Sequence, residues 1–194
     1  MISKVQKNCI IIHGCPPTQE KFLQMQTQNF AGHWIGDVKK ELMMRNVLTK
    51  SPIMPRAFEP NYEKYKFEIS KYPINENTIL IGHSCACSFL VRYLGDTKKK
   101  IAKLILVAPM KIAKEGDIFK EAFYNFEIDK SIKERVKEII IFTSDNEEDR
   151  GKESAKIFNE ALGGEIILIP GFGHYRREDL GNNKFSELLQ VVLR

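Results

Sequence analysis

The sequence has no long run of apolar residues. Its first apolar stretch, Cys9 to Ile12, is far shorter than the roughly 20 residues that a membrane-spanning helix requires. The same stretch is too short for the apolar core of a secretory signal peptide. We therefore expect a cytoplasmic protein that does not associate with membranes.

Cysteine is scarce, with four residues in a chain of 194. Cys85 and Cys87 form a close pair, but the chain has no second such pair and no histidine pair at zinc-ligand spacing, so we expect no metal site. Thiols stay reduced in the cytoplasm, so we expect Cys9, Cys15, Cys85 and Cys87 to be free. Cys15 and Cys85 would be sensitive to oxidation if they line a site.

A strong charge bias and a glycine-rich phosphate loop are both missing. The net charge is only +5, and the densest basic run, 98–100, is predicted to be a solvated loop, so no nucleic-acid partner is expected. The first predicted strand is followed by Cys15-Pro16-Pro17, which offers few free N–H groups to a phosphate. This argues against a flavodoxin-like nucleotide binder, and we expect no cofactor.

Apolar runs of strand length alternate with segments of helical period. The predicted strands are 8–13, 47–51, 78–81, 102–108, 138–143 and 165–169. The predicted helices are 35–45, 62–72, 85–94, 152–162 and a last one around 185–192, with 119–126 a short helix or a cover over the site. Near-continuous Ile, Leu and Val runs favour parallel strands buried on both faces. We predict a single α/β domain over residues 1–194, a three-layer sandwich with a mostly parallel sheet, helices on both faces and little or no lid.

The clearest chemical signal is Gly82-His83-Ser84, which stands between a predicted strand and a predicted helix. A serine on such a sharp turn is exposed to substrate, and the pattern is that of a nucleophile elbow, G-x-S-x-G, with Ala86 in place of the last glycine. The helix behind it offers free N–H groups and the positive end of its dipole to an oxyanion. Ser84 is therefore the candidate nucleophile.

Two other strand ends carry groups that could activate this serine. The carboxyl ends of parallel strands meet at one edge of a sheet. An acidic loop with Asp145 and Glu147 follows the fifth predicted strand, and His174 follows the last. The order serine, acid, histidine is that of a catalytic triad. With a reference pKa of about 6.5, a histidine can accept the proton of Ser84, and a carboxylate can orient the ring; Asp145 and Glu147 are both candidates for that acid.

The loop after the first strand completes the predicted site. A main-chain N–H of Gly14 or Cys15 is expected to bind the oxyanion together with that of Cys85. His13 is expected to shape this loop, and His83 to point away from the nucleophile on the next residue.

Aromatic residues near the predicted site are candidates for substrate binding. Trp34, His33 and Phe172 suggest an apolar acyl or aromatic group, although core packing of such side chains is at least as common. For His33 the alternative is a residue at the start of a surface helix.

These residues resemble a known family, the compact serine hydrolases typified by retinoblastoma-binding protein nine, within the α/β-hydrolase superfamily. The resemblance covers nearly the whole chain. It runs through Ile11-Ile12-His13-Gly14, His33-Trp34-Ile35-Gly36-Asp37-Val38-Lys39-Lys40-Glu41-Leu42, Met54-Pro55, Ile81-Gly82-His83-Ser84, Leu106-Val107-Ala108 and Gly173-His174-Tyr175. It implies an α/β-hydrolase-like domain. The family's acid stands three residues after a serine, which from Ser144 implies Glu147. The protein that typifies the family has a partner-binding motif, Leu-x-Cys-x-Glu. This chain lacks that motif, so we do not expect the same partner.

We therefore expect a small cytoplasmic serine hydrolase that cleaves a small-molecule ester, or less favourably an amide, through an acyl-enzyme on Ser84. The alternative is a non-catalytic module of the same fold that binds a ligand or a protein, which Ala86 and Pro16-Pro17 favour. Labelling of Ser84 by a fluorophosphonate distinguishes the two.

Overall fold

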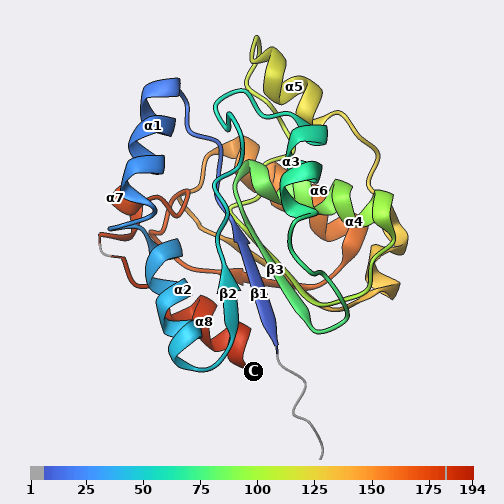
Figure 1. Ribbon diagram of the computed structural model, residues 1–194. Helices are drawn as coiled ribbons and strands as arrows, with labels where there is room; N and C mark the ends of the chain where they lie inside the picture. Colours follow the sequence, from blue (N-terminus) through green and yellow to red (C-terminus); the bar gives the residue numbers. More distant parts are fainter. Residues whose placement is uncertain (1–6, 182) are drawn as a thin grey trace, which may run out of the picture.

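The computed structural model describes residues 7–181 and 183–194 and shows a sheet flanked by helices on both faces (Figure 1). Its six strands lie in the order β2-β1-β3-β4-β5-β6, and every neighbouring pair is parallel. The strands are β1 (Asn8–Ile12), β2 (Leu48–Lys50), β3 (Thr78–His83), β4 (Ile101–Val107), β5 (Val136–Thr143) and β6 (Glu165–Leu168). The predicted fold is confirmed, and the sheet is parallel throughout rather than mostly so.

The helices form two outer layers. They are α1 (Gln19–Gln28), α2 (Trp34–Met44), α3 (Tyr62–Ile69), α4 (Cys85–Thr97), α5 (Ile118–Tyr124), α6 (Asp149–Leu162), α7 (Arg177–Leu180) and α8 (Ser186–Leu193), with a 3-10 turn η1 (Lys130–Glu134). Helices α2 and α8 cover one face of the sheet, and α3, α4 and α6 cover the other (Figure 1). Within the described residues, none of these helices combines the length and hydropathy needed to cross a bilayer.

Alternation along the strands explains this double cover. In β1, Ile10 and Ile12 belong to the core beneath α3 and α4, whereas Cys9 and Ile11 belong to the core beneath α2 and α8. Since successive side chains of a strand point to opposite faces, a run that is apolar at every position must be buried on both. This rule made the strands predictable. Because the strands are all parallel, their carboxyl ends lie at a single edge of the sheet.

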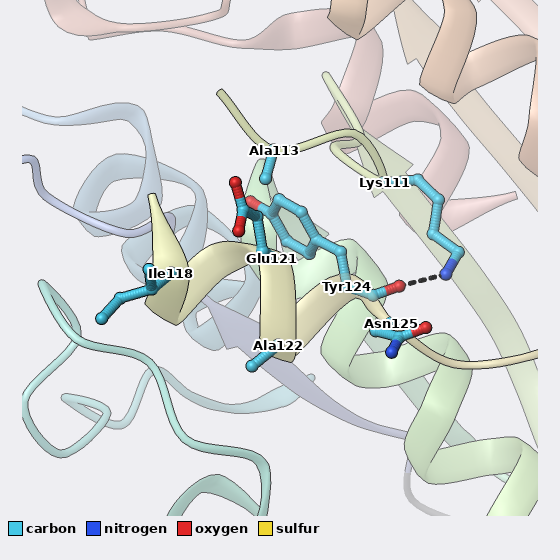
Figure 2. Close-up of a pocket in the computed structure, with 7 residues that line it drawn as sticks. All are labelled: Lys111, Ala113, Ile118, Glu121, Ala122, Tyr124 and Asn125. Carbon is cyan, nitrogen blue, oxygen red and sulfur yellow. Dashed lines mark hydrogen bonds between the residues drawn. The ribbon is translucent and has the colours of Figure 1, made fainter. Parts of the chain in front are cut away.

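Within the segment between β4 and β5, Lys111 joins the start of the segment to the end of α5. Its ammonium group donates a hydrogen bond to the carbonyl of Tyr124 (Figure 2) and another, at 2.8 Å, to that of Phe126. Burial lowers the pKa of Lys111 to about 8. The predicted cover at 119–126 is the short helix α5, with no larger lid in this segment.

Candidate active site

Ser84 lies at the turn between β3 and α4 with φ 56° and ψ −121°, a backbone conformation that residues with side chains rarely adopt. The turn is fixed because the Ser84 N–H donates to the Val107 carbonyl at 2.9 Å. Gly82 permits the close approach of strand and helix: a Cβ added there would lie 3.0 Å from main-chain atoms of Ala86 and Cys87. The methyl group of Ala86 is itself fully buried. The strained turn of a nucleophile elbow is therefore present with alanine at its last position.

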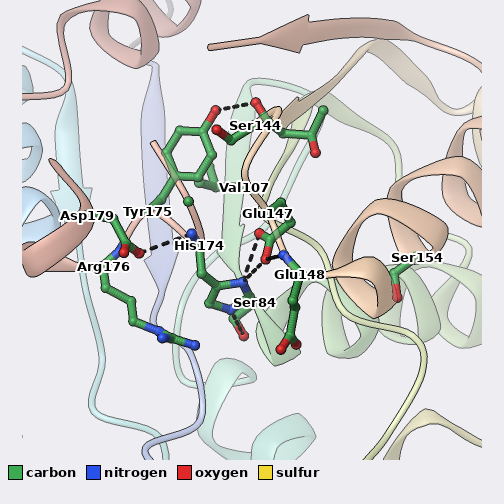
Figure 3. Close-up of polar contacts among 12 residues, drawn as sticks. Ser84, Val107, Ser144, Glu147, Glu148, Ser154, His174, Tyr175, Arg176 and Asp179 are labelled. Carbon is green, nitrogen blue, oxygen red and sulfur yellow. Dashed lines mark hydrogen bonds and ion pairs between the residues drawn. The ribbon is translucent and has the colours of Figure 1, made fainter. Parts of the chain in front are cut away.

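Three side chains from three strand ends form one hydrogen-bonded chain (Figure 3). His174 Nε2 lies 2.8 Å from Ser84 Oγ, and His174 Nδ1 lies 3.0 and 2.9 Å from the two carboxylate oxygens of Glu147. Because the carboxylate can only accept, Nδ1 carries the proton and Nε2 is free to accept the Ser84 hydroxyl proton. The arrangement can generate a reactive alkoxide at Ser84.

Glu147 fits behind the imidazole because α6 leaves room for it. The carboxylate is almost fully buried, and a Cβ added at Gly151, in the first turn of α6, would lie 2.6 Å from Glu147 Cγ. The Glu148 N–H donates to Glu147 Oε1 at 2.9 Å, which helps to fix the carboxylate. A glycine four residues after the acid is the sequence signal that could have distinguished Glu147 from Asp145.

Asp145 has a different partner. Its exposed carboxylate accepts a hydrogen bond at 2.7 Å from the N–H of Gly171, which lowers the pKa of Asp145. Its two neighbours make similar bonds to the histidine loop, from Phe172 N–H to Ser144 Oγ at 3.0 Å and from Gly173 N–H to Asn146 Oδ1 at 2.7 Å. The structure therefore brings Glu147, and not Asp145, to the imidazole, while Asp145 helps to hold the loop that carries it.

His83 has a role that the sequence did not reveal. Its Nε2–H donates to the main-chain carbonyl of His174 at 2.9 Å, so the buried ring supports the loop of the candidate base. Burial holds the pKa of His83 well below its usual range, which keeps the ring neutral. Among the described residues, the hydrogen-bond partner of the Ser84 hydroxyl is His174 and not His83.

The prediction that His13 shapes the first loop is confirmed. Its Nε2 accepts the Met54 N–H at 2.9 Å, so Nδ1 carries the proton and donates to the Gly14 carbonyl at 2.7 Å. Burial lowers the pKa of His13 to about 4. A Cβ added at Gly14 would lie 3.0 Å from Ser84 Cβ, which shows how closely this loop passes the nucleophile.

The expectation of four free thiols is wrong for two of them. Cys15 and Cys85 form a disulfide with a Cα–Cα distance of 5.8 Å, whereas Cys9 and Cys87 are free and buried. The two bonded residues are 70 positions apart in sequence. They meet because β1 and β3 are neighbours and each cysteine follows one of these strands closely.

The candidate oxyanion donors lie beside this disulfide. Cys85 is the first residue of α4, and Cys15 lies in the loop that passes over Ser84. Among the described residues, neither main-chain N–H has a hydrogen-bond acceptor in the protein. Two unpaired N–H groups next to a serine hydroxyl are what an oxyanion hole requires.

A cleft of about 880 Å³ contains Ser84, His174 and His33. His33 also caps α2, where its Nδ1 accepts the Ile35 N–H at 3.2 Å, so it is both a helix-start residue and part of the cleft wall. Other apolar residues also line the cleft. Met25, Phe30, Met110 and Ile112 were not suggested by the sequence, whereas Tyr124 belongs to the predicted cover at 119–126.

Trp34 and Phe172 do not line this cleft, which corrects the prediction that they bind substrate. Trp34 is fully buried, and its Nε1–H donates to the Tyr175 carbonyl at 2.9 Å. The Phe172 ring packs against those of Tyr175 and Phe185, at centroid distances of 5.7 and 6.4 Å. Both side chains therefore stabilise the histidine loop from the core side.

The residues that the structure describes include no group of three or more His, Cys, Asp or Glu side chains arranged to hold a metal ion.

Comparisons with known proteins agree with the fold and indicate the family. The family model described as "Serine hydrolase" matches residues 26–193. The protein YdeN of Bacillus subtilis (strain 168) is 31% identical over 80 residues, a match that spans 39% of this chain and 42% of YdeN, so it covers less than half of that relative. The crystal structure of YdeN aligns over 97% of both chains with a TM-score of 0.82 and 21% identity. Est1E from Butyrivibrio proteoclasticus aligns over 97% of this chain and 89% of its own, with a TM-score of 0.62 and 16% identity.

Proposed function

Because the chain belongs to the serine hydrolase family, we propose that it hydrolyses carboxylic esters through an acyl-enzyme on Ser84. The observation that carries the proposal is the chain of hydrogen bonds from Glu147 through His174 to Ser84, with every contact between 2.8 and 3.0 Å. Amides are a less favoured substrate class, since their leaving groups are poorer.

In the first half of the reaction, Ser84 Oγ attacks the ester carbonyl while His174 Nε2 takes its proton. The main-chain N–H groups of Cys85 and Cys15 donate to the resulting oxyanion. Glu147 keeps the Nδ1 proton in place and stabilises the imidazolium. When the tetrahedral intermediate collapses, His174 returns the proton to the leaving alcohol, and the acyl group stays on Ser84.

In the second half, water replaces the alcohol. His174 takes a proton from the water, the hydroxide attacks the acyl carbonyl, and the carboxylic acid leaves as Ser84 recovers its proton. None of these steps calls for a cofactor.

The cleft wall supports an acyl group of moderate size and apolar character. Phe30, Met110 and Ile112 line the cleft together with Ser84, as do several charged side chains. Such a mixture suits a small molecule with an apolar acyl part. The solved structures of similar fold include one described as an esterase domain from a Rhodothermus marinus protein, which aligns with a TM-score of 0.60 and 11% identity.

The cytoplasmic location stays a prediction, as does the absence of nucleic-acid and membrane partners. A persistent bond between Cys15 and Cys85 would favour an oxidising compartment instead, since reducing agents of the cytoplasm open most disulfides.

A panel of short- and medium-chain esters tests the proposal. Wild type and Ser186→Ala, a control at an exposed serine of α8, are expected to turn over at least one ester, while Ser84→Ala and His174→Ala fall to the background rate. A folded wild-type protein that hydrolyses none of the panel at any pH between about 6 and 9 would favour the ligand-binding alternative.

A further inference from the structure

We propose that the Cys15–Cys85 disulfide positions the oxyanion hole, so that the enzyme turns over rapidly with the bond intact and slowly once a dithiol has reduced it. The inference rests on the function proposed above. It assigns to the cysteine side chains a role distinct from that of their own main-chain N–H groups.

The disulfide joins the same two residues that carry the proposed oxyanion donors. Cys15 and Cys85 are bonded to each other, and their free main-chain N–H groups are those donors. The bond therefore restrains the distance between the two residues that carry the donors, whose Cα atoms lie 5.8 Å apart. Donors must lie within about 2.7–3.1 Å of the oxyanion to be effective, so this spacing has little tolerance.

The main chain holds Cys85 more firmly than it holds Cys15. Cys85 is fully buried and belongs to a helix of 13 residues, so its N–H is held by α4. Cys15 lies in a loop where Pro16 and Pro17 have no N–H to donate. On the amino side the loop is held by His13, whose Nε2 accepts the Met54 N–H at 2.9 Å, and the Cys15 Sγ lies 3.9 Å from the Tyr65 hydroxyl. On the carboxyl side, the next main-chain bond in the described residues is the one at the start of α1, from Phe22 N–H to the Thr18 carbonyl.

Reduction of the disulfide separates the two sulfur atoms. A dithiol attacks a sulfur of the bond, forms a mixed disulfide and then closes to its own cyclic disulfide. It supplies two electrons, and two protons complete the thiols of Cys15 and Cys85. Cys15 is partly exposed and lines the cleft, which gives a small dithiol access. The two sulfur atoms must then move apart to van der Waals contact, and the loop of Cys15, rather than the helix of Cys85, has the freedom to move.

The expected kinetic signature is a fall in kcat with little change in KM, because the hole binds the transition state more strongly than the ester. Complete loss of one donor costs about 10²–10³-fold in rate, so a displaced donor should lower kcat by at least about tenfold. The affinity for a trifluoromethyl ketone should fall by the same factor, because its adduct with Ser84 places an oxyanion in the hole. If the disulfide only stabilised the fold, reduced protein that is still folded would keep the kcat and the trifluoromethyl ketone affinity of the oxidised protein.

The test compares wild type before and after treatment with dithiothreitol, which is then removed under argon. Thiol titration of denatured protein should rise from two to four thiols per chain, in accord with one disulfide and two free cysteines. The kcat should fall at least tenfold, KM should stay within about threefold, and reoxidation should restore the rate. Cys15→Ser should show the reduced kcat without treatment and no response to dithiothreitol, while Cys9→Ala, which keeps the bond, should respond as wild type does.

Three results would overturn the proposal. Reduced protein with four thiols and an unchanged kcat would show that the bond does not position the hole, while the hydrolase function would stand. Loss of the near-ultraviolet circular dichroism on reduction would show that the bond holds the fold instead. Absence of ester turnover and of fluorophosphonate labelling in both redox forms would overturn the proposed function, and this inference with it.

Discussion

Glu147 and Asp145 stand two positions apart in one loop, and only the carboxylate of Glu147 contacts the imidazole of His174. The loop leaves β5 and turns into α6 so that Glu147 is buried and Asp145 is exposed. The chemistry of the side chains alone could not show which residue is the acid of the triad, because either carboxylate can orient a histidine. The distinction comes from burial, and Gly151 makes that burial possible.

Replacement of the two acids by their amides tests this assignment. Glu147→Gln should lower kcat by up to about 10⁴-fold, because an amide no longer fixes the productive tautomer of His174. Asp145→Asn is the matched control: the amide oxygen can still accept the Gly171 N–H, so kcat should change less than about threefold. Steady-state kinetics on one ester measures both. A larger loss in Asp145→Asn than in Glu147→Gln would contradict the assignment.

The site could be predicted from the sequence only in part, and the reason is physical. The serine, the histidine and the pair of candidate acids were identifiable, because each directly follows a predicted strand and the ends of parallel strands converge. The contact from His83 to the His174 carbonyl and the disulfide between Cys15 and Cys85 depend on side-chain directions that no local pattern encodes. Trp34 was misassigned because an aromatic residue suits a substrate cleft and a core equally well.

At the scale of elements, the strands were predictable because apolar runs of their length have few alternatives. Helix α1 was not predicted, since Phe22 is its only buried residue and its apolar period is weak. A local signal was present, as Thr18 caps the helix by accepting the Lys21 N–H at 3.2 Å. The end of α4 was placed too early: the helix continues through Gly95 to Thr97, and a Cβ on Gly95 would lie 3.2 Å from Asp129 Cβ. This glycine serves packing rather than termination.

The contact between β3 and α4 at the elbow gives a second prediction. Gly82→Ala places a methyl group 3.0 Å from the main chain of Ala86 and Cys87, where the helix has no flexible atoms to yield. We expect a loss of about 1–3 kcal/mol in the free energy of unfolding and a lower kcat, because α4 and Ser84 must shift. Urea unfolding and ester kinetics measure the two effects.

Ala86→Gly is the matched control for this contact. It removes a methyl group on the facing element and should cost only about 0.5–1 kcal/mol, mainly through the flexibility of glycine in a helix, with kcat preserved. If Gly82→Ala were as stable and as active as wild type, the close approach of strand and helix would not be needed at the elbow.

For the molecule as a whole, stability should decrease in mild acid because buried histidines must become charged. The unfolded chain binds a proton at His13 below about pH 6.5, whereas burial lowers the pKa of His13 in the folded chain to about 4. The stability associated with the neutral ring is therefore fully present above pH 6.5 and is lost as the pH falls towards 4. Protonation of Nε2 would also break its bond with the Met54 N–H.

Urea unfolding at pH 7 and pH 5 measures this linkage. Wild type should lose about 2 kcal/mol from His13 between these two pH values, and His13→Gln should show a pH dependence smaller by about that amount. His33 and His83 remain in the variant, so part of the acid sensitivity should persist. An equal pH dependence in the two proteins would show that the His13 ring is not kept neutral by its burial.

The proposed activity depends on one arrangement of the whole molecule: the ends of parallel strands bring a serine, a histidine and a glutamate to one edge of the sheet. Reaction with a fluorophosphonate, followed by intact mass and peptide mapping, tests the claim that this edge activates Ser84. We expect one adduct per chain, carried by Ser84 and absent from His174→Ala. Folded protein that remains unlabelled, or that carries its adduct on another residue, would contradict it.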